Sequence, residues 1–523
     1  MSSTQTITSQ SRTTAGSSRP WAVLAVLCLS LFMVVLDVTI VNVAIPTLGK
    51  DLGAGTTDLQ WIVDAYTLVF SALLLALGHV GDRWGRKGAL QAGVVLFALA
   101  SFLAARSGSI EQLIAARAFM GVGAALVFPA TLAILVNTFT DLRQRAAAIG
   151  IWSATTGVAI ACGPVVGGYL LEHFSWGSIF MVNIPVAVIA LVAGMFILPT
   201  SRDPHAGTLD WTGFVLSAIG VALLVWAIIE GPREGWTSAK VLGCFVVAAI
   251  LLTLFVLWER RQVHPLLDVN VFKDMRFTAA SMAVATAFFA LFGFIFLITQ
   301  YLQLVQGYSP FEAGLRTVPF AAATAVMSPI AIVLMHRFGT KLVVTAGLLL
   351  MGAGFAVAAT SDASTAYVGP ILISMLLGGS GLALATGPST DSIMGSLSDD
   401  KAGVGSAVND TTREIGGTLG VAVVGSVFAS VFGPHLRDSL AALSVPTDVA
   451  AKASESLGAA LAIAAQAPPE MSGRLMIAAK DAFVSGLSVG CYVAVAAVVI
   501  GAVVTMVFLP ARHSERGETS SIS

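Results

Sequence analysis

Long apolar runs alternate with short polar breaks along almost the whole 523-residue chain. Each run approaches or exceeds the roughly 20 apolar residues that a helix needs to cross the core of a bilayer. The pattern therefore predicts an all-α polytopic membrane protein with fourteen transmembrane helices. The expected spans are residues 21–45, 59–78, 88–105, 111–136, 146–170, 177–198, 210–230, 240–258, 277–303, 313–335, 341–360, 367–390, 404–432 and 482–509.

A weak sequence repeat divides these spans into two sets of six. The segment GHVGDRWGRK after the second span is echoed by IVLMHRFGTK after the tenth, so that Gly85 aligns with Gly339 at an offset of 254 residues. A second echo relates Gly121 in the fourth span to Gly379 in the twelfth. Parallel repeats of six spans build one large class of transporters.

The repeat sets the expected domain organisation, in which two spans have no repeat partner. They form an insert between the two six-helix halves. The expected segments are a disordered cytoplasmic tail (1–20), a first half (21–198), a linker with the two inserted helices (199–276), a second half (277–510) with a long outer loop (433–481), and a cytoplasmic tail (511–523).

Charge is scarce and unevenly placed. Only 11% of residues are charged, against about 25% in soluble globular proteins, and 56% are hydrophobic. The balance of 28 basic and 29 acidic residues excludes the concentrated basic face of a nucleic-acid-binding protein.

With the N-terminus inside, seventeen Lys and Arg fall on the cytoplasmic side and five in the short outer loops. The positive-inside rule therefore predicts that both termini are cytoplasmic.

No pattern points to an enzyme or a metal protein. The chain has no P-loop and no HExxH, CxxC or GxSxG signature. Its four cysteines sit in apolar runs without the spacing of metal ligands, which favours small buried side chains. We expect no metal and no cofactor. The cysteines are Cys28, Cys162, Cys244 and Cys491.

Four segments together resemble the major facilitator superfamily, and within it the fourteen-span drug:proton antiporter group. LDVTIVNVAIP (36–46) is similar to that group's first-helix motif, and 78–90 to the superfamily's loop motif GxLxDRxGRKxxL. RAFMGVGAA (117–125) resembles the span-four motif, and GVAIACGPVVGG (157–168) the antiporter motif of span five. The resemblance covers almost the whole chain. WGSIF (176–180) departs from the group, which usually has a second aromatic residue and an Arg there.

The resemblance implies a major facilitator fold and a plasma-membrane antiporter that uses the proton gradient. The expected cargo is an amphipathic, drug-like small molecule. A same-fold exporter of a dedicated cargo, such as a self-made antibiotic, a siderophore, an amino acid or a lipid, is the alternative. The expected partners are the substrate, protons and membrane lipids, with no nucleic acid, and the expected state is a monomer. A membrane enzyme or sensor is disfavoured because no catalytic constellation is present.

The loop after the second span carries the charges expected of a gate. Asp82 lies at the C-terminal end of a helix, where the helix dipole disfavours an anion unless a cation neutralises it. We expect a charge-paired latch between helix ends that breaks as the halves rock. The alternative is a plain positive-inside anchor. The gating-loop residues are Gly78, Asp82, Arg83, Gly85, Arg86 and Lys87.

Small residues recur in the fifth span. Glycines four apart allow close approach of membrane helices, and an internal proline frees a carbonyl and bends the helix. We expect a tight seam between the halves, although ordinary small-residue packing predicts the same composition. The antiporter-motif residues are Gly157, Gly163, Pro164, Gly167 and Gly168.

Three buried charges lie at overlapping depths in the first half. Asp37 is about 13 Å and Arg117 about 9 Å below the outer ends of their helices, at 1.5 Å per residue. Asp64 enters its span from the same side. A charge inside the membrane is costly unless it is paired or hydrated. We expect Asp37 and Arg117 to pair near Asp64 and to serve proton coupling; a static salt bridge is the alternative.

The thirteenth span carries a second charged cluster. Asp410, Arg413 and Glu414 are neighbours at helical spacings of three and four residues. Two acids and one base leave net negative charge, which suits a proton site or a wall that attracts cations. An intrahelical salt bridge in which Glu414 keeps its proton is the alternative.

Overall fold

A computed structural model describes residues 20–202, 210–263, 265–397 and 402–510, and every regular element in these ranges is helical. Fourteen helical segments are long and apolar enough to cross a membrane, as predicted. The two expected tails lie outside these ranges except for Pro20, which opens the first helix. The helices are α1 (Pro20–Leu52), α2 (Thr56–Trp84), α3 (Arg86–Ala105), α4 (Ile110–Thr138), α5 (Leu142–His173), α6 (Ser178–Met181), α7 (Asn183–Ile197), α8 (Trp211–Glu234), α9 (Ala239–Glu259), η1 (Val269–Lys273), α10 (Met275–Gln300), η2 (Tyr301–Val305), α11 (Pro310–Phe338), α12 (Thr340–Ala358), η3 (Tyr367–Ile371), α13 (Leu372–Met394), α14 (Ala402–Ala442), α15 (Thr447–Ala453), α16 (Leu457–Gln466) and α17 (Pro469–Phe508).

Three spans depart from one uninterrupted α-helix. The sixth is divided into α6 and α7 at Val182. The ninth ends in the π-helical turn η2, a geometry that often marks a functional site. The twelfth begins in η3, where Val368 and Gly369 leave the helical region and Gly369 takes a φ of 147°. Hydropathy predicts the length of such spans and says nothing about these local breaks.

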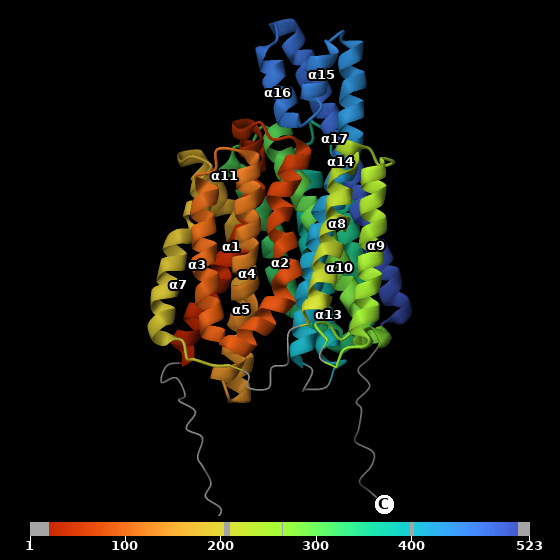
Figure 1. Cartoon of the computed structure of the whole chain (residues 1–523). Helices are drawn as coiled ribbons and strands as arrows, with labels where there is room; N and C mark the ends of the chain where they lie inside the picture. The colour runs from red at the N-terminus through yellow and green to blue at the C-terminus, as the bar shows by residue number, and fades with distance from the viewer. Residues whose placement is uncertain (1–19, 203–209, 264, 398–401, 511–523) are drawn as a thin grey trace, which may run out of the picture.

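The segment expected as a long outer loop, 433–481, is mostly helical in the structure. α14 and α17 continue past the apolar parts of their spans, and α15 and α16 lie between them. Figure 1 shows this group projecting from one end of the bundle. Apolar side chains such as Leu436, Leu440 and Leu475 are buried inside it, which gives this alanine-rich segment a small core of its own. We call this group the cap, and its end of the bundle the capped end.

Paired glycine contacts reproduce the sequence repeat in three dimensions. Gly85 ends α2 at a φ of 129°, and Gly339 ends α11 at a φ of 85°. A Cβ on Gly123 would meet the carbonyl oxygen of Gly93 at 2.9 Å, and one on Gly381 would meet that of Gly347 at 2.5 Å. Gly347 follows Gly93 by the same 254 residues that separate Gly339 from Gly85.

The inserted helix α8 packs against both α2 of the first half and α14 of the second. The indole Nε1 of Trp61 donates to Glu230 Oε1 at 3.0 Å, which joins α2 to α8. The hydroxyl of Ser426 donates to the carbonyl of Ile228 at 2.7 Å, which joins α14 to α8. The insert therefore bridges the two halves.

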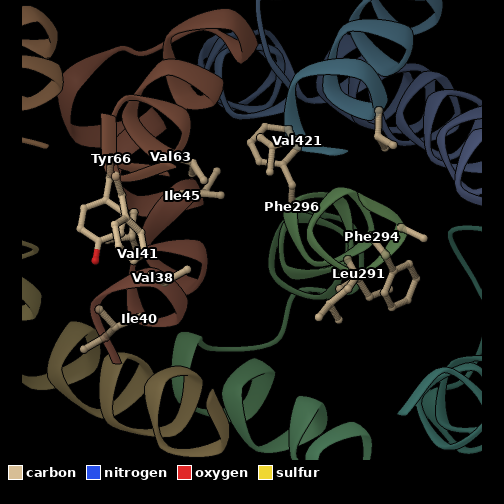
Figure 2. Packing of buried hydrophobic residues seen from close by; sticks show 14 of the residues in the cluster. Val38, Ile40, Val41, Ile45, Val63, Tyr66, Leu291, Phe294, Phe296 and Val421 are labelled. Atoms are coloured by element: carbon tan, nitrogen blue, oxygen red, sulfur yellow. The ribbon is translucent and has the colours of Figure 1, made fainter. Parts of the chain in front are cut away.

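One large apolar core runs through both halves and into the cap. Figure 2 shows part of it, with Val41 and Ile45 on α1 and Phe294 and Phe296 on α10. The phenylalanines of α10 belong to this core or pack against it. Phe294 and Phe296 are buried, and Phe288, Phe289 and Phe292 are partly buried.

Candidate functional site

Asp37 of α1 and Arg117 of α4 form an ion pair in the interior of the first half. Arg117 Nη1 contacts Asp37 Oδ2, and the two side chains are 1% and 0% exposed, the arginine first. Burying two charges costs several kcal/mol per ion, which mutual attraction offsets only if the remaining polar atoms are also satisfied. The predicted pairing of these residues is therefore present in the structure.

Further hydrogen bonds and an aromatic ring contact the two members of this ion pair. Asn183, at the start of α7, donates from Nδ2 to the second oxygen of Asp37 at 3.0 Å. Arg117 Nε donates to the carbonyl of Ile62 at 3.1 Å, and its guanidinium lies 4.5 Å from the ring centroid of Tyr66. Asn183 was not among the predicted site residues. A lone amide in an apolar membrane span is costly unless it is hydrogen-bonded. The position of Asn183 within such a span could therefore have marked it as a candidate.

Asp64 of α2 is buried but does not join the ion pair. Its Oδ1 lies 3.5 Å from the hydroxyl of Thr67, and its Oδ2 has no hydrogen-bond partner among the described residues. The arginine reaches the backbone of α2 at Ile62 instead of this carboxyl group. The expected cluster of three charges is thus a closed pair and a separate acid.

The second cluster, on α14, does not form the intrahelical salt bridge that was the alternative to a proton site. Arg413 Nη2 donates to the hydroxyl of Thr390 on α13 at 3.2 Å, and its guanidinium lies 5.4 Å from the ring centroid of Phe288 on α10. Within the described ranges Arg413 forms no ion pair with Asp410 or Glu414, and all three side chains are partly buried. The arginine therefore ties three helices together.

A cavity of about 550 Å³, including its solvent-open part, lies between the two halves. Its walls come from α1 and α5 on one side and from α10, α11 and α13 on the other. No ionisable side chain is among its lining residues, so the Asp37–Arg117 pair does not form part of the cavity wall. The lining residues are Thr39, Asn42, Val43, Ile160, Ala161, Pro164, Phe294, Ile295, Ile298, Thr299, Thr317, Phe320, Ala321 and Met375.

The span-five motif contributes to two different interfaces. A Cβ on Gly163 or Gly167 would strike Thr39 or Ile40 of α1, within the same half. A Cβ on Gly168 would lie 2.5 Å from the carbonyl oxygen of Pro310 on α11, in the other half. The expected seam between halves therefore rests on Gly168, and on Pro164, whose carbonyl oxygen abuts Gly314 of α11.

Gly157 does not take part in either interface. A Cβ there would meet no atom within 4 Å, and the residue is exposed. Its expected packing role is wrong in this conformation, because this stretch of α5 has no helix close against it at that position.

Hydrogen bonds from side chains to backbone carbonyls also join the two halves near the capped end. Gln60 of α2 donates from Nε2 to the carbonyls of Val421 and Ala422 on α14, at 3.2 and 3.1 Å. Gln303 of η2 donates to the carbonyl of Val43 on α1 at 2.9 Å. Because Val43 also lines the cavity, these contacts close the space between the halves toward the capped end.

The gating loop between α2 and α3, at the end of the bundle opposite the cap, contacts helices of the first half. Arg86 Nε lies 2.6 Å from Asp82 Oδ1, so the expected charge pair is present. Lys87 donates instead to the carbonyls of Met195 and Leu198 at the end of α7, at 2.7 and 3.0 Å. The side chain of Arg83 is exposed, so of these three bases Arg86 is the one that pairs with Asp82 in the structure. Gly78 fits closely against Pro129 of α4, where an added Cβ would lie 3.3 Å from the proline Cβ.

Metal-ligating side chains do not gather in the described ranges, where no group of three His, Cys, Asp or Glu residues could hold an ion. The arrangement instead offers a cavity between two halves, a buried ion pair and an unpaired acid.

Known proteins resemble this chain over nearly its full length. A family model described as Major Facilitator Superfamily matches residues 27–421. The multidrug efflux pump LfrA of Mycolicibacterium smegmatis is 37% identical over 492 residues, covering 94% of this chain and 97% of that pump. The tetracenomycin C resistance and export protein of Streptomyces glaucescens is 32% identical, covering 95% of this chain and 93% of that protein. The solved structure of a bacterial homologue of the human lysosomal transporter Spinster has a TM-score of 0.64 at 17% identity, covering 95% of this chain and 99% of that one.

Proposed function

The chain belongs to the major facilitator superfamily, and on that premise we propose that it exports amphipathic, drug-like small molecules in exchange for protons. It is a multi-pass membrane transporter and not an enzyme. The observation that carries the proposal is the cavity between the halves, whose α1 wall also carries the buried Asp37. With a cargo cavity and a buried acid on the same helix, a movement of α1 can change both sites together, which is one way to couple their occupancies.

The proposed cycle alternates access from one side of the cavity to the other. Gly168, Gln60 and Gln303 hold the halves together at the capped end, which supports a conformation closed on that side. The distribution of Lys and Arg supports placing the capped end outside the plasma membrane and both termini in the cytoplasm. Cargo would then enter from the cytoplasm and leave after the capped end opens.

Proton coupling is proposed to use the two buried acids of the first half. Asp37 is satisfied by Arg117 and Asn183 in this conformation, so its partners must change before it takes up a proton. Asp64 has an oxygen without a donor, and a buried charge without a partner is costly. A proton on Asp64 neutralises the charge and so lowers that cost.

The charged cluster on α14 is proposed as a second site. Asp410, Glu414 and Arg413 would bind a proton or attract a cation, because two acids and one base leave net negative charge there. The protein is proposed to act as a monomer, with the proton gradient in place of a cofactor.

The test uses everted membrane vesicles, in which export appears as uptake. An acid-inside pH gradient should drive the uptake of a fluorescent lipophilic dye, and addition of the dye should dissipate part of the gradient. A protonophore should abolish uptake. Uptake of equal rate and extent without any gradient would refute proton coupling, and absence of uptake for every compound that loses potency in an expressing, efflux-deficient host would refute export.

A dedicated cargo is the second candidate, favoured by the relative named for tetracenomycin C resistance and export. A panel of structurally unrelated compounds separates the two. A broad exporter should lower the potency of several chemical classes in an efflux-deficient host, whereas a dedicated exporter should protect against one.

A further inference from the structure

The cavity wall contains one polar atom that the described part of the chain leaves without a partner. Asn42 of α1 is 2% exposed, and its Nδ2 donates to the carbonyl of Val38 at 2.9 Å. Its Oδ1 is buried and has no hydrogen-bond partner among those residues. Exchanging the two ends of the amide would set its oxygen against the Val38 carbonyl, so hydrogen bonding fixes which end is free.

The other polar groups of the cavity have already used their hydrogens. The hydroxyl of Thr39 donates to Leu36, that of Thr299 to Ile295, and that of Thr317 to Gly314, at 3.1, 3.0 and 2.7 Å. A hydroxyl that donates its single hydrogen can only accept further bonds. The cavity thus presents acceptors, with apolar and aromatic surface from Phe294 and Phe320 around them.

An unpartnered acceptor is costly to keep. A buried polar group without its hydrogen bond costs about 1–3 kcal/mol, and the penalty is recovered when a donor arrives. Gln303 lies one turn of helix beyond the cavity-lining Thr299, and one of its amide hydrogens is donated to the carbonyl of Val43, the residue after Asn42. None of its hydrogens reaches Asn42 Oδ1. Because Asn42 lines the cavity, a molecule bound there can supply the donor.

We propose that Asn42 Oδ1 is a cargo-binding acceptor and that the cavity selects molecules that bring an N–H or O–H donor on an apolar, aromatic body. Protonated secondary and tertiary amines, anilines, amides and phenols belong to this class. A carboxylate has no hydrogen to donate to Asn42 Oδ1 and should therefore bind more weakly. This inference rests on the proposed function, since it takes the cavity to be the cargo site.

The test compares two cations that share one aromatic body. One is a tertiary amine, which carries an N–H when protonated, and the other is its N-methylated quaternary form, which has no donor. Binding of each is measured on the full-length protein in lipid nanodiscs, and transport in everted vesicles. We expect wild type to bind the N–H compound about tenfold more tightly, a difference that corresponds to about 1.4 kcal/mol.

Two substitutions at the same position separate hydrogen bonding from shape. Asn42→Leu keeps the bulk and removes the acceptor, so the ratio of the two dissociation constants should fall toward one. Asn42→Thr keeps an acceptor oxygen and should retain a preference for the N–H compound. Equal affinities in wild type, or an unchanged ratio in Asn42→Leu, would overturn the proposal. A preference that depends on Asn42 without transport driven by a pH gradient would support the acceptor and refute proton-coupled export instead.

Discussion

At the scale of single residues, the structure separates two acids that hydropathy treats alike. Asp37 is closed in by Arg117 and Asn183, whereas Asp64 keeps an oxygen without a donor among the described residues. Breaking a buried ion pair by removing one charge costs about 3–5 kcal/mol because the other charge stays buried. The two acids should therefore respond differently to the same chemical change.

Asp37→Asn should lower the thermal stability of the purified protein strongly and abolish substrate-induced proton flux in proteoliposomes. Asp64→Asn should leave stability unchanged or raise it, because no cation loses its partner and an unpartnered buried acid is removed. A double substitution, Asp37→Asn with Arg117→Gln, should recover stability without recovering proton flux. Full antiport in the folded Asp37→Asn protein would rule out its role in coupling.

The Asp37–Arg117 pair was predictable from sequence because a membrane span penalises every charge and the two residues lie at similar depths. Asn183 was missed because it is not ionisable, although a buried amide obeys the same rule. Asn42 could not be found in this way. Whether an amide oxygen is free or bonded depends on the rotation of α1 against its neighbours, which depth along a helix does not report.

At the scale of elements, close helix contacts depend on single glycines that face a neighbouring backbone. Gly168 faces Pro310 and Phe311 of α11 across the seam between the halves, whereas a Cβ added to Gly150 on the same helix would meet no described atom within 4 Å. The sequence predicts a seam in span five. It cannot say which glycine faces which helix, because that depends on the rotation of α5 about its axis.

Gly168→Ala should therefore weaken the closed capped end, since a Cβ would sit 2.5 Å from the Pro310 carbonyl oxygen and force α5 and α11 apart. Overpacking typically costs about 1–3 kcal/mol. We expect reduced efflux. We also expect a membrane-impermeant reagent to label a cysteine introduced at the cavity-lining Ala161 faster than in the parent protein. Gly150→Ala is the matched control and should behave as wild type. Equal labelling and efflux in both variants would show that this contact does not hold the seam.

At the scale of the whole molecule, the fourteen spans were predictable because bilayer thickness dictates the length of an apolar helix. The arrangement of the cap was not predictable from hydropathy. Its helices lie beyond the apolar spans, where bilayer thickness does not dictate their length. The cap is built on α14 and α17 of the second half and rests on the first half. The amide and the hydroxyl of Thr56 both donate to the carbonyl of Glu455, at 2.8 and 2.9 Å.

A disulfide between Gly55→Cys and Glu455→Cys should lock the cap to the first half. A Cβ on Gly55 would lie 3.6 Å from that of Glu455, within the range that a disulfide spans. Oxidation should stop efflux in cells, and a reducing agent should restore it. The two single cysteine variants control for substitution alone. Unimpaired efflux with the cross-link formed would show that the cap keeps its contact throughout the cycle.

The position of the cap has a pharmacological consequence. An inhibitor of the central cavity has to reach it through a membrane and competes with every cargo the pump accepts. If the capped end faces outward, as proposed, a small antibody fragment that grips both the cap and the turn at Gly55 would act from outside the cell. It would keep the capped end closed whichever compound occupies the cavity. Mutations that change the contacts between cavity and cargo would not restore transport.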